Sequence, residues 1–416
     1  MRENPLTNDG TDLQSNNFGV ITTDGTFESM ISFCAQHTEA GVGLHWKQGF
    51  AFSEDKCKWW YLDIDLPIQY VRNKFTISEN VINDGGGINT AVAGVGIPVV
   101  ANMIQAFSQS DWLFGKVNNC CKLSKTGIAD MEVKLGRQFV YTDQCMIAGY
   151  FGVLVPTSNS PCGQFIFEPV LGHGKHVGVM WGTEGGYEIL SNCDDTWHFW
   201  LDYGCHAMYL FKHNEIRSFD LKNRPWSRYI SVYANQAQAA QADSTGDVNV
   251  SKFLSTPGIN VFTQCVQVTP GFQTNMTTAL VFDHDCGFVG EVGYNLFFRQ
   301  NECVQLNWTE GPAIKAAIGG GATNPVLDIS DTPLLVPLFV PFANYSSSLI
   351  NQADLDLQSA AHPTITTELL YFNLGYQWDN RCNPIYLGLG ASYEFALKNY
   401  AVMNRWGIWG KFNVAF

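Results

Sequence analysis

The feature that most constrains the fold of this chain is the alternation in its last eleven residues, WGIWGKFNVAF. Apolar side chains occupy one parity of this stretch, at Trp406, Ile408, Phe412, Val414 and Phe416. The other parity holds small or polar residues, with Trp409 as the bulky exception. Because successive side chains of a β-strand point to opposite faces, the pattern predicts a strand with one continuous apolar face.

Similar alternation recurs along the chain. We predict strands at residues 41–52, 58–72, 129–141, 145–156, 176–190, 196–211, 272–282, 287–299, 364–378, 384–395 and 406–416. An ordinary strand has about 5–6 residues, whereas a tilted strand that crosses a bilayer needs about 9–11. The length of these segments therefore favours a sheet that spans a membrane.

The composition agrees with this prediction. Charged residues make up 15% of the 416 residues and aromatic residues 13%, whereas soluble domains are about 25% charged. Prolines and glycines interrupt the uncharged stretches 85–110 and 333–342, so neither predicts a spanning helix. A net charge of −14 argues against a nucleic-acid partner. A large secreted β-protein is the alternative class.

The terminal strand resembles the closing strand of Gram-negative outer-membrane β-barrels, whose C-terminal Phe belongs to an insertion signal. In this sequence Trp406, Phe412, Val414 and Phe416 would form that signal. The stretches TGIADMEVKLG (126–136) and GVLVPT (152–157) resemble FadL-type transporter barrels. The resemblance implies an outer-membrane location, contact with outer-membrane lipid, and recognition of the last strand by the barrel assembly machinery. No signal peptide is visible, so the numbering is expected to begin at a mature or engineered N-terminus.

Short turns and long connections alternate between the predicted strands, except for a short outer turn at residues 397–399. The long connections cover about 74–126, 158–175, 212–266 and 300–362, and all fall at one end if the strands are antiparallel. A closed barrel with an even strand number also needs a strand before residue 41, for which 27–36 is the candidate. We therefore predict an all-β fold, an antiparallel transmembrane barrel of about 12 strands, or 14 if a loop hides a hairpin. Residues 1–24 form a polar N-terminal segment or plug, and 25–416 form the barrel.

The chain has 12 cysteines and no C-x-x-C pair, which favours disulfides over metal sites. Ten cysteines lie in or beside the predicted loops and turns: Cys120, Cys121, Cys162, Cys265 and Cys303 in the loops, and Cys57, Cys145, Cys193, Cys286 and Cys382 at the turns. This cysteine-rich design resembles chlamydial major outer-membrane porins and implies links to other envelope proteins. Alternatively, the thiols pack as small buried side chains.

The parity opposite the apolar face supplies candidate pore-lining residues. They are Asp63, Asp65, Asp130, Glu132, Lys134, Glu184, Glu188, His198, Asp202, His206, Glu291, Arg299, Glu394, Arg405 and Lys411. Carboxylates outnumber lysines and arginines in this set, and acidic linings favour cations. The alternative is that these groups pair with one another and close the interior.

These observations predict a porin-like channel for passive diffusion of small hydrophilic solutes, with a weak preference for cations. A homo-oligomer is one expected assembly. One alternative is a structural or adhesive surface barrel cross-linked by cysteines. Another is a hydrophobic-substrate transporter or a barrel hydrolase. His198 and His206 have no identifiable Ser partner, and His173 and His176 lie on a glycine-rich loop. We therefore expect no catalytic residue, metal or cofactor.

Overall fold

The computed structural model describes residues 15–24, 26–50, 59–89, 99–119, 121–194, 196–223, 225–233, 255–306, 334–337, 347–350, 355–378, 383–397 and 402–415. Within these ranges the protein is built almost entirely of β-strands. A search of the described residues for helices that could cross a membrane finds none.

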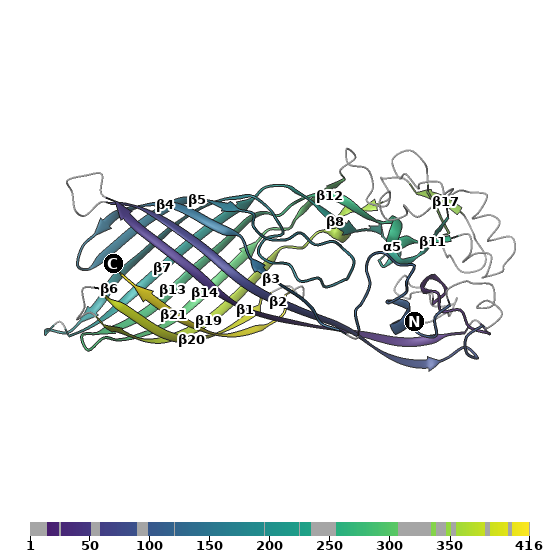
Figure 1. Cartoon of the computed structure of the whole chain (residues 1–416), viewed down its shortest axis with the longest axis horizontal. Coiled ribbons are helices and arrows are strands. Elements are labelled where there is room, and N and C mark those ends of the chain that lie inside the picture. Colours follow the sequence, from purple (N-terminus) through teal and green to yellow (C-terminus); the bar gives the residue numbers. More distant parts are fainter. Residues whose placement is uncertain are drawn as a thin grey trace.

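One antiparallel sheet of 12 strands dominates the molecule (Figure 1), as the sequence predicts. Eleven of its strands follow one another in chain order: β1 (Glu28–Phe50), β2 (Trp60–Asn83), β4 (Met131–Tyr141), β5 (Cys145–Val155), β6 (Gly178–Ser191), β7 (Trp197–Leu210), β13 (Gly271–His284), β14 (Phe288–Arg299), β19 (Ile365–Trp378), β20 (Ile385–Ala396) and β21 (Arg405–Val414). The twelfth, β3 (Leu123–Ile128), pairs with β2 beyond the end of β4. Thus β3 and β4 share one position in the strand order.

The first strand differs from the prediction. Residues 27–36 do not form a separate strand, because β1 runs without interruption from Glu28 to Phe50 and pairs with β2 along its whole length. The intervening residues 37–40, HTEA, contain no Gly, Pro, Asn or Asp to make a turn. As a result, the first described residues and the C-terminal strand end lie at opposite ends of the sheet (Figure 1).

Several connections that the sequence analysis treats as long loops carry regular structure. The strands β8 (His213–Ser218), β12 (Thr263–Thr269) and β15 (Cys303–Leu306) form a second sheet next to the ends of β7, β13 and β14. The other short elements are η1 (Ser15–Phe18), α2 (Met103–Ala106), β9 (Asp220–Leu221), η2 (Ser227–Tyr229), β10 (Ser231–Tyr233), β11 (Ser255–Pro257), α5 (Gly258–Val261), β16 (Leu334–Pro337), β17 (Ser347–Ile350), β18 (Leu355–Asp356) and η4 (Leu357–Ala360).

The described parts of the long connections pack together at the end of the sheet opposite the C-terminal strand end, and we call this assembly the cap (Figure 1). Its main core joins residues from the N-terminal segment, α2, η2 and α5. They include Phe18, Phe107, Trp112 and Tyr229, which are almost fully buried and whose rings contact one another, with Trp112 stacked on Tyr229 and edge-to-face with Phe107. The described part of the N-terminal segment therefore belongs to the cap.

The main sheet is curled, and one of its faces is concave. Lys47 Nζ in β1 lies 2.8 Å from Glu184 Oε1 in β6, although three strands separate β1 from β6. Lys411 Nζ in β21 lies 3.7 Å from Glu291 Oε2 in β14, across β19 and β20. Side chains of strands that are not neighbours can meet only on the inside of a curved sheet.

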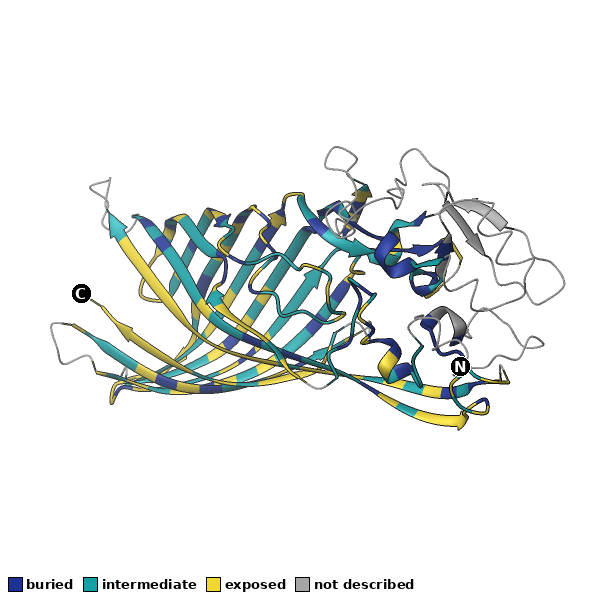
Figure 2. Cartoon of the chain, turned by 45° about the vertical axis from the view of Figure 1, so that its right-hand side comes forward, coloured by how far each residue is buried: buried dark blue, intermediate teal, exposed yellow. Residues whose placement is uncertain are grey.

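The convex face is apolar and exposed, as the alternating pattern predicts (Figure 2). On β21, Trp406 and Ile408 are each 75% exposed, and Phe412 and Val414 share their parity. Phe416, the last residue of the predicted insertion signal, lies outside the described residues. Trp409 faces the concave side, where its ring lies over Gly390 of β20.

The edges of the sheet, β1 and β21, run in the same direction. No strand pairing joins them among the described residues. Arg405 at the start of β21 nevertheless lies close enough to His37 and Glu39 of β1 to act on both electrostatically. The two edges therefore approach each other at this point.

The cysteines do not form the predicted disulfides within the described residues. No two of these cysteines lie at disulfide distance. Free thiols occur at Cys34, Cys145, Cys162, Cys193, Cys205, Cys286 and Cys303. The prediction is therefore wrong for the loop residues Cys162 and Cys303, because the fold places their strands and turns apart. Cys57, Cys120 and Cys382 lie outside the described residues.

Candidate functional site

Polar side chains from β1, β2 and β6 meet on the concave face. Tyr61 Oη donates a hydrogen bond to Glu184 Oε1 at 3.2 Å, and Lys47 Nζ lies 4.1 Å above the Tyr61 ring. Tyr61 can lie flat along the sheet because its neighbour on β4, Gly136, has no side chain. Glu184 was predicted in the pore lining from strand parity, whereas Lys47 and Tyr61 were not, although both have the same parity as Asp63.

A second group of charges lies beside this contact, on β1, β2 and β4. His45 Nε2 is 3.1 Å from Asp63 Oδ1. Lys134 Nζ is 2.6 Å from Asp65 Oδ2 and 2.7 Å from Glu132 Oε2. The ligand atoms of His45, Asp63 and Asp65 all lie within 4.8 Å of one another, the arrangement needed to hold a metal ion. We call these five residues the β1–β4 cluster.

The other half of the concave face has its own polar group on β14, β19, β20 and β21. Tyr371 Oη donates to Glu291 Oε1 at 2.8 Å, and Asn373 Nδ2 donates to Tyr386 Oη at 2.6 Å. Lys411 approaches the same Glu291 carboxylate. These contacts leave the carboxylate of Glu291 partly neutralised.

Three further contacts place five more of the predicted lining residues on this face. Glu394 on β20 accepts hydrogen bonds from the Arg405 guanidinium, and His198 Nδ1 lies 3.3 Å from Glu188 Oε2. His206 Nδ1 is 2.7 Å from Tyr150 Oη.

The concave face carries more acidic than basic side chains. Its carboxylates are Asp63, Asp65, Glu132, Glu184, Glu188, Asp202, Glu291 and Glu394, and its lysines and arginines are Lys47, Lys134, Arg405 and Lys411. Many of these side chains remain open to water, including Glu184 at 46% and Lys411 at 48%. The face can therefore be hydrated and keeps an excess of negative charge.

Two predicted lining residues have other positions. Asp130 lies between β3 and β4, and its carboxylate accepts hydrogen bonds from the backbone of His173 at 2.5 Å and of Ser158 at 3.3 Å. It fixes the connection 156–177 to the sheet. Arg299, the last residue of β14, lines a cavity between the sheet and the cap. The alternation of side chains along a strand could not show that Asp130 and Arg299 lie outside the concave face, because it does not say where the strand ends.

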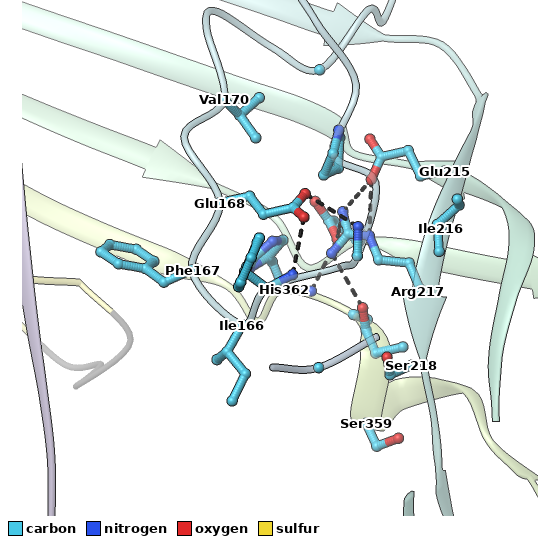
Figure 3. A pocket seen from close by; sticks show the side chains of 18 of the residues that line it. Ile166, Phe167, Glu168, Val170, Glu215, Ile216, Arg217, Ser218, Ser359 and His362 are labelled. Carbon is cyan, nitrogen blue, oxygen red and sulfur yellow. Dashed lines mark hydrogen bonds and ion pairs between the residues drawn. The ribbon is translucent and has the colours of Figure 1, made fainter. Parts of the chain in front are cut away.

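This cavity has a volume of about 730 Å³ and lies where the sheet meets the cap. Figure 3 shows Glu215, Arg217 and His362 close together in its wall, with Glu168 nearby. Its other lining residues include five aromatic side chains, Phe33, Phe75, Phe165, Phe167 and Trp226. It therefore has charged and aromatic parts, and we call it the mouth cavity.

The charges of the mouth cavity are connected in a buried chain. His176 Nε2 lies 2.8 Å from Glu215 Oε1, and Arg217 Nη2 lies 2.6 Å from Glu215 Oε2 and 3.4 Å from Glu302 Oε2. The backbone N–H of His362 donates to Glu302 Oε2 at 3.0 Å. These contacts attach residue 362, beyond the end of η4, to β8 and β15.

Desolvation and neighbouring charges shift the pKa values of two residues in this group of ion pairs, Glu215 and His362. Burial raises the pKa of Glu215, but the hydrogen bond from His176 and the charge of Arg217 outweigh it, so the pKa lies below its ordinary value. Partial desolvation in the mouth cavity lowers the pKa of His362, and the Arg217 and Arg299 guanidinium groups lower it further against the opposing charge of Glu302. Glu215 is therefore held ionised and His362 neutral.

His173 and His176, noted in the sequence for their glycine-rich loop, serve as anchors in the structure. His173 Nδ1 lies 2.9 Å from Asp130 Oδ2, and His176 belongs to the buried chain of the mouth cavity. Within the described part of the protein, the His45, Asp63 and Asp65 group is the one found with metal-ligand geometry. Neither a protein-family model nor a curated protein matches this chain.

Proposed function

We infer that the protein is a pore of the bacterial outer membrane, which lets small hydrophilic solutes diffuse passively and weakly prefers cations. The observation that carries this proposal is the reversed polarity of the curled sheet. Its convex face is apolar and its concave face is charged. A soluble protein has the opposite arrangement, with apolar side chains enclosed.

The apolar convex face supports insertion into lipid. Leu280, Val292 and Phe372 lie side by side on β13, β14 and β19 and are 52%, 65% and 52% exposed. Transfer of one such side chain from water to an apolar medium stabilises by about 1.5–3 kcal/mol. Because most strands of the sheet carry such residues, contact with water on this whole face would be very unfavourable.

The two ends of the sheet support an orientation. The short turns after β4, β6 and β13 and the C-terminal strand end lie at one end, and the long connections form the cap at the other, where β20 also ends and β21 begins. Bacterial outer-membrane barrels have short periplasmic turns and long external loops. We therefore place the cap on the outside of the cell, with the mouth cavity beside the entrance.

The excess of carboxylates on the concave face supports the cation preference. Among the described residues, Asp202 makes no ion pair with a basic group, and it lies near the acidic Glu291. A passing cation would therefore meet two neighbouring carboxyl groups and no fixed counter-ion at Asp202. Acidic linings attract cations, and salt screens this attraction over about 10 Å at 0.1 M and about 3 Å at 1 M.

Single-channel recording in planar bilayers tests the proposal. We expect discrete conductance, a reversal potential of the sign for cations in a salt gradient, and a preference that fades as salt rises. Asp202→Asn should reduce the preference, whereas Asp84→Asn should leave it unchanged, because Asp84 lies exposed in the cap beyond the end of β2. An anion-selective current would contradict the mechanism.

If the protein inserts into the bilayer but gives no current, the result would contradict the proposed pore and favour a structural surface barrel. One observation fits that second function. Cys193 and Cys286 carry exposed free thiols at the short-turn end of the sheet, where they could form disulfides with other envelope proteins. Such disulfides between different proteins would strengthen the cell envelope even though the chain has none between its own described cysteines.

A further inference from the structure

We propose that His45, Asp63 and Asp65 form a binding site for a divalent transition-metal ion of the Zn²⁺ class on the concave face. An ion held there would obstruct the pore, so the protein would be a zinc-sensitive channel. The second statement rests on the proposed function, whereas the binding site itself does not.

The strand pairing holds the three ligands in place. His45 of β1 is directly opposite Asp65 of β2, and Asp63 precedes Asp65 by two residues, so all three side chains leave the sheet on the same face. His45 Nε2 and Asp63 Oδ1 are already 3.1 Å apart. Ligands that each bind Zn²⁺ at about 2.0–2.2 Å lie about 3–3.5 Å from one another. The Asp65 ligand atom lies within 4.8 Å of both, so side-chain rotation can bring it to the same ion.

The charge of the β1–β4 cluster is not balanced without a cation. Asp63, Asp65 and Glu132 contribute three negative charges, and Lys134 contributes one positive charge, which leaves −2 when His45 is neutral. A divalent ion would neutralise this remainder. Lys134 occupies Asp65 Oδ2, so Asp65 Oδ1 remains to bind the metal, and the ammonium group can stay in place.

The ligand types select among divalent ions. Mg²⁺ and Ca²⁺ prefer sites made of oxygen atoms, whereas an imidazole nitrogen favours Zn²⁺, Cu²⁺ or Ni²⁺. Three protein ligands leave the fourth position of a tetrahedral zinc ion open to water. The His45 side chain is 53% exposed and that of Asp63 is 11% exposed, so an ion can reach the site from the hydrated interior and leave again.

The first test measures binding without any need for conduction. Isothermal titration of ZnCl₂ into the full chain in detergent, with all thiols blocked by N-ethylmaleimide, should give one saturable site. His45→Ala and Asp65→Asn should each weaken binding at least about tenfold, because even the loss of an outer partner of a metal ligand costs about 10–100-fold. His198→Ala is the matched control, because His198 faces the same interior beside Glu188 but outside the cluster.

A third variant should act in the opposite direction. Lys134→Met makes the net charge of the cluster more negative, from −2 to −3, and should tighten Zn²⁺ binding. MgCl₂ should compete poorly in every variant. Binding that is absent, or equal in the wild type, His45→Ala and Asp65→Asn proteins, would overturn the site. Retained folding of each variant is checked by its migration in gels before and after heating.

The second test adds conduction. Micromolar ZnCl₂ should reduce the current of the wild-type protein and of His198→Ala but not that of His45→Ala. If the protein binds zinc at His45 but its current does not change, the proposal that the bound ion obstructs the pore would be wrong. Zinc binding in a protein that does not conduct would support the site and reject the pore, so the two proposals fail separately.

Discussion

At the scale of single residues, the most consequential contacts join positions far apart in the sequence. Glu215 and Glu302 are connected through Arg217, and Glu302 exchanges backbone and side-chain hydrogen bonds with His362. No local pattern in the sequence reveals these contacts, because they depend on how β8, β15 and the segment after η4 pack. The charge excess of the concave face was predictable, since it follows from strand parity.

The titration of His362 in the wall of the mouth cavity predicts that acid loosens the cap. Its folded-state pKa lies below the ordinary value of about 6.5. The neutral form is therefore favoured by folding, and this stabilisation is fully present above about pH 6.5 and declines as the pH falls below it. The depressed pKa of Glu215 acts in the same direction, but only below its ordinary value of about 4.5.

We expect hydrogen exchange in residues 355–362 to accelerate between pH 7 and pH 5, after correction for the intrinsic rate. His362→Asn should reduce this pH dependence, because it removes the titrating ring. Peptides from β13, in the centre of the main sheet, provide the internal control. Equal protection of residues 355–362 at both pH values would contradict this account of the buried chain.

At the scale of elements, glycines make room for inward-facing aromatic rings. Tyr61 lies over Gly136, Tyr371 over Gly293, and Trp409 over Gly390. In each pair the two residues are directly opposite each other on neighbouring strands. Trp409, the bulky exception in the terminal strand, is thus one case of a repeated packing arrangement. The positions of the aromatic residues and glycines predict this arrangement only once the register of the strands is known.

Gly136→Ala should destabilise the sheet by about 1–3 kcal/mol, because the new methyl group would overlap the Tyr61 ring. Gly204→Ala is the matched control, since a methyl group there meets no atom within 4 Å. The temperature at which the folded protein changes its gel migration measures the difference. Equal transition temperatures for the two variants would show that the ring yields easily.

Strand periodicity predicted the elements of the main sheet better than those of the cap. The turns at residues 142–143, 191–195 and 283–286 lie where the structure has its short connections, since polar turn residues interrupt a clear alternation there. The strands β8, β12 and β15 were predicted as loop, because each has only 4–7 residues and their pairing is set by the strands they extend. In the same way, pairing with β2 makes β1 continuous through residues 37–40, where the sequence predicted a break between two strands.

At the scale of the whole molecule, the account depends on which face of the curled sheet meets lipid. The sequence predicted an apolar and a polar face, but it could not show which polar groups meet across the concave side. Those contacts, such as Lys47 with Glu184, exist because the sheet curves. Curvature arises from the packing of all the strands together and has no signature in any one of them.

Photo-crosslinking along one strand tests this central claim most directly. A photoreactive phenylalanine analogue is placed in turn at Tyr371, Phe372, Asn373 and Leu374 of β19, in cells, and lipid adducts are measured by mass spectrometry. The analogue at Phe372 and Leu374 should crosslink to acyl chains, because these side chains are exposed on the convex face. At Tyr371 and Asn373 it should not, because both contact Glu291 on the concave face. Equal labelling of all four positions, or none at Phe372 and Leu374, would contradict the account.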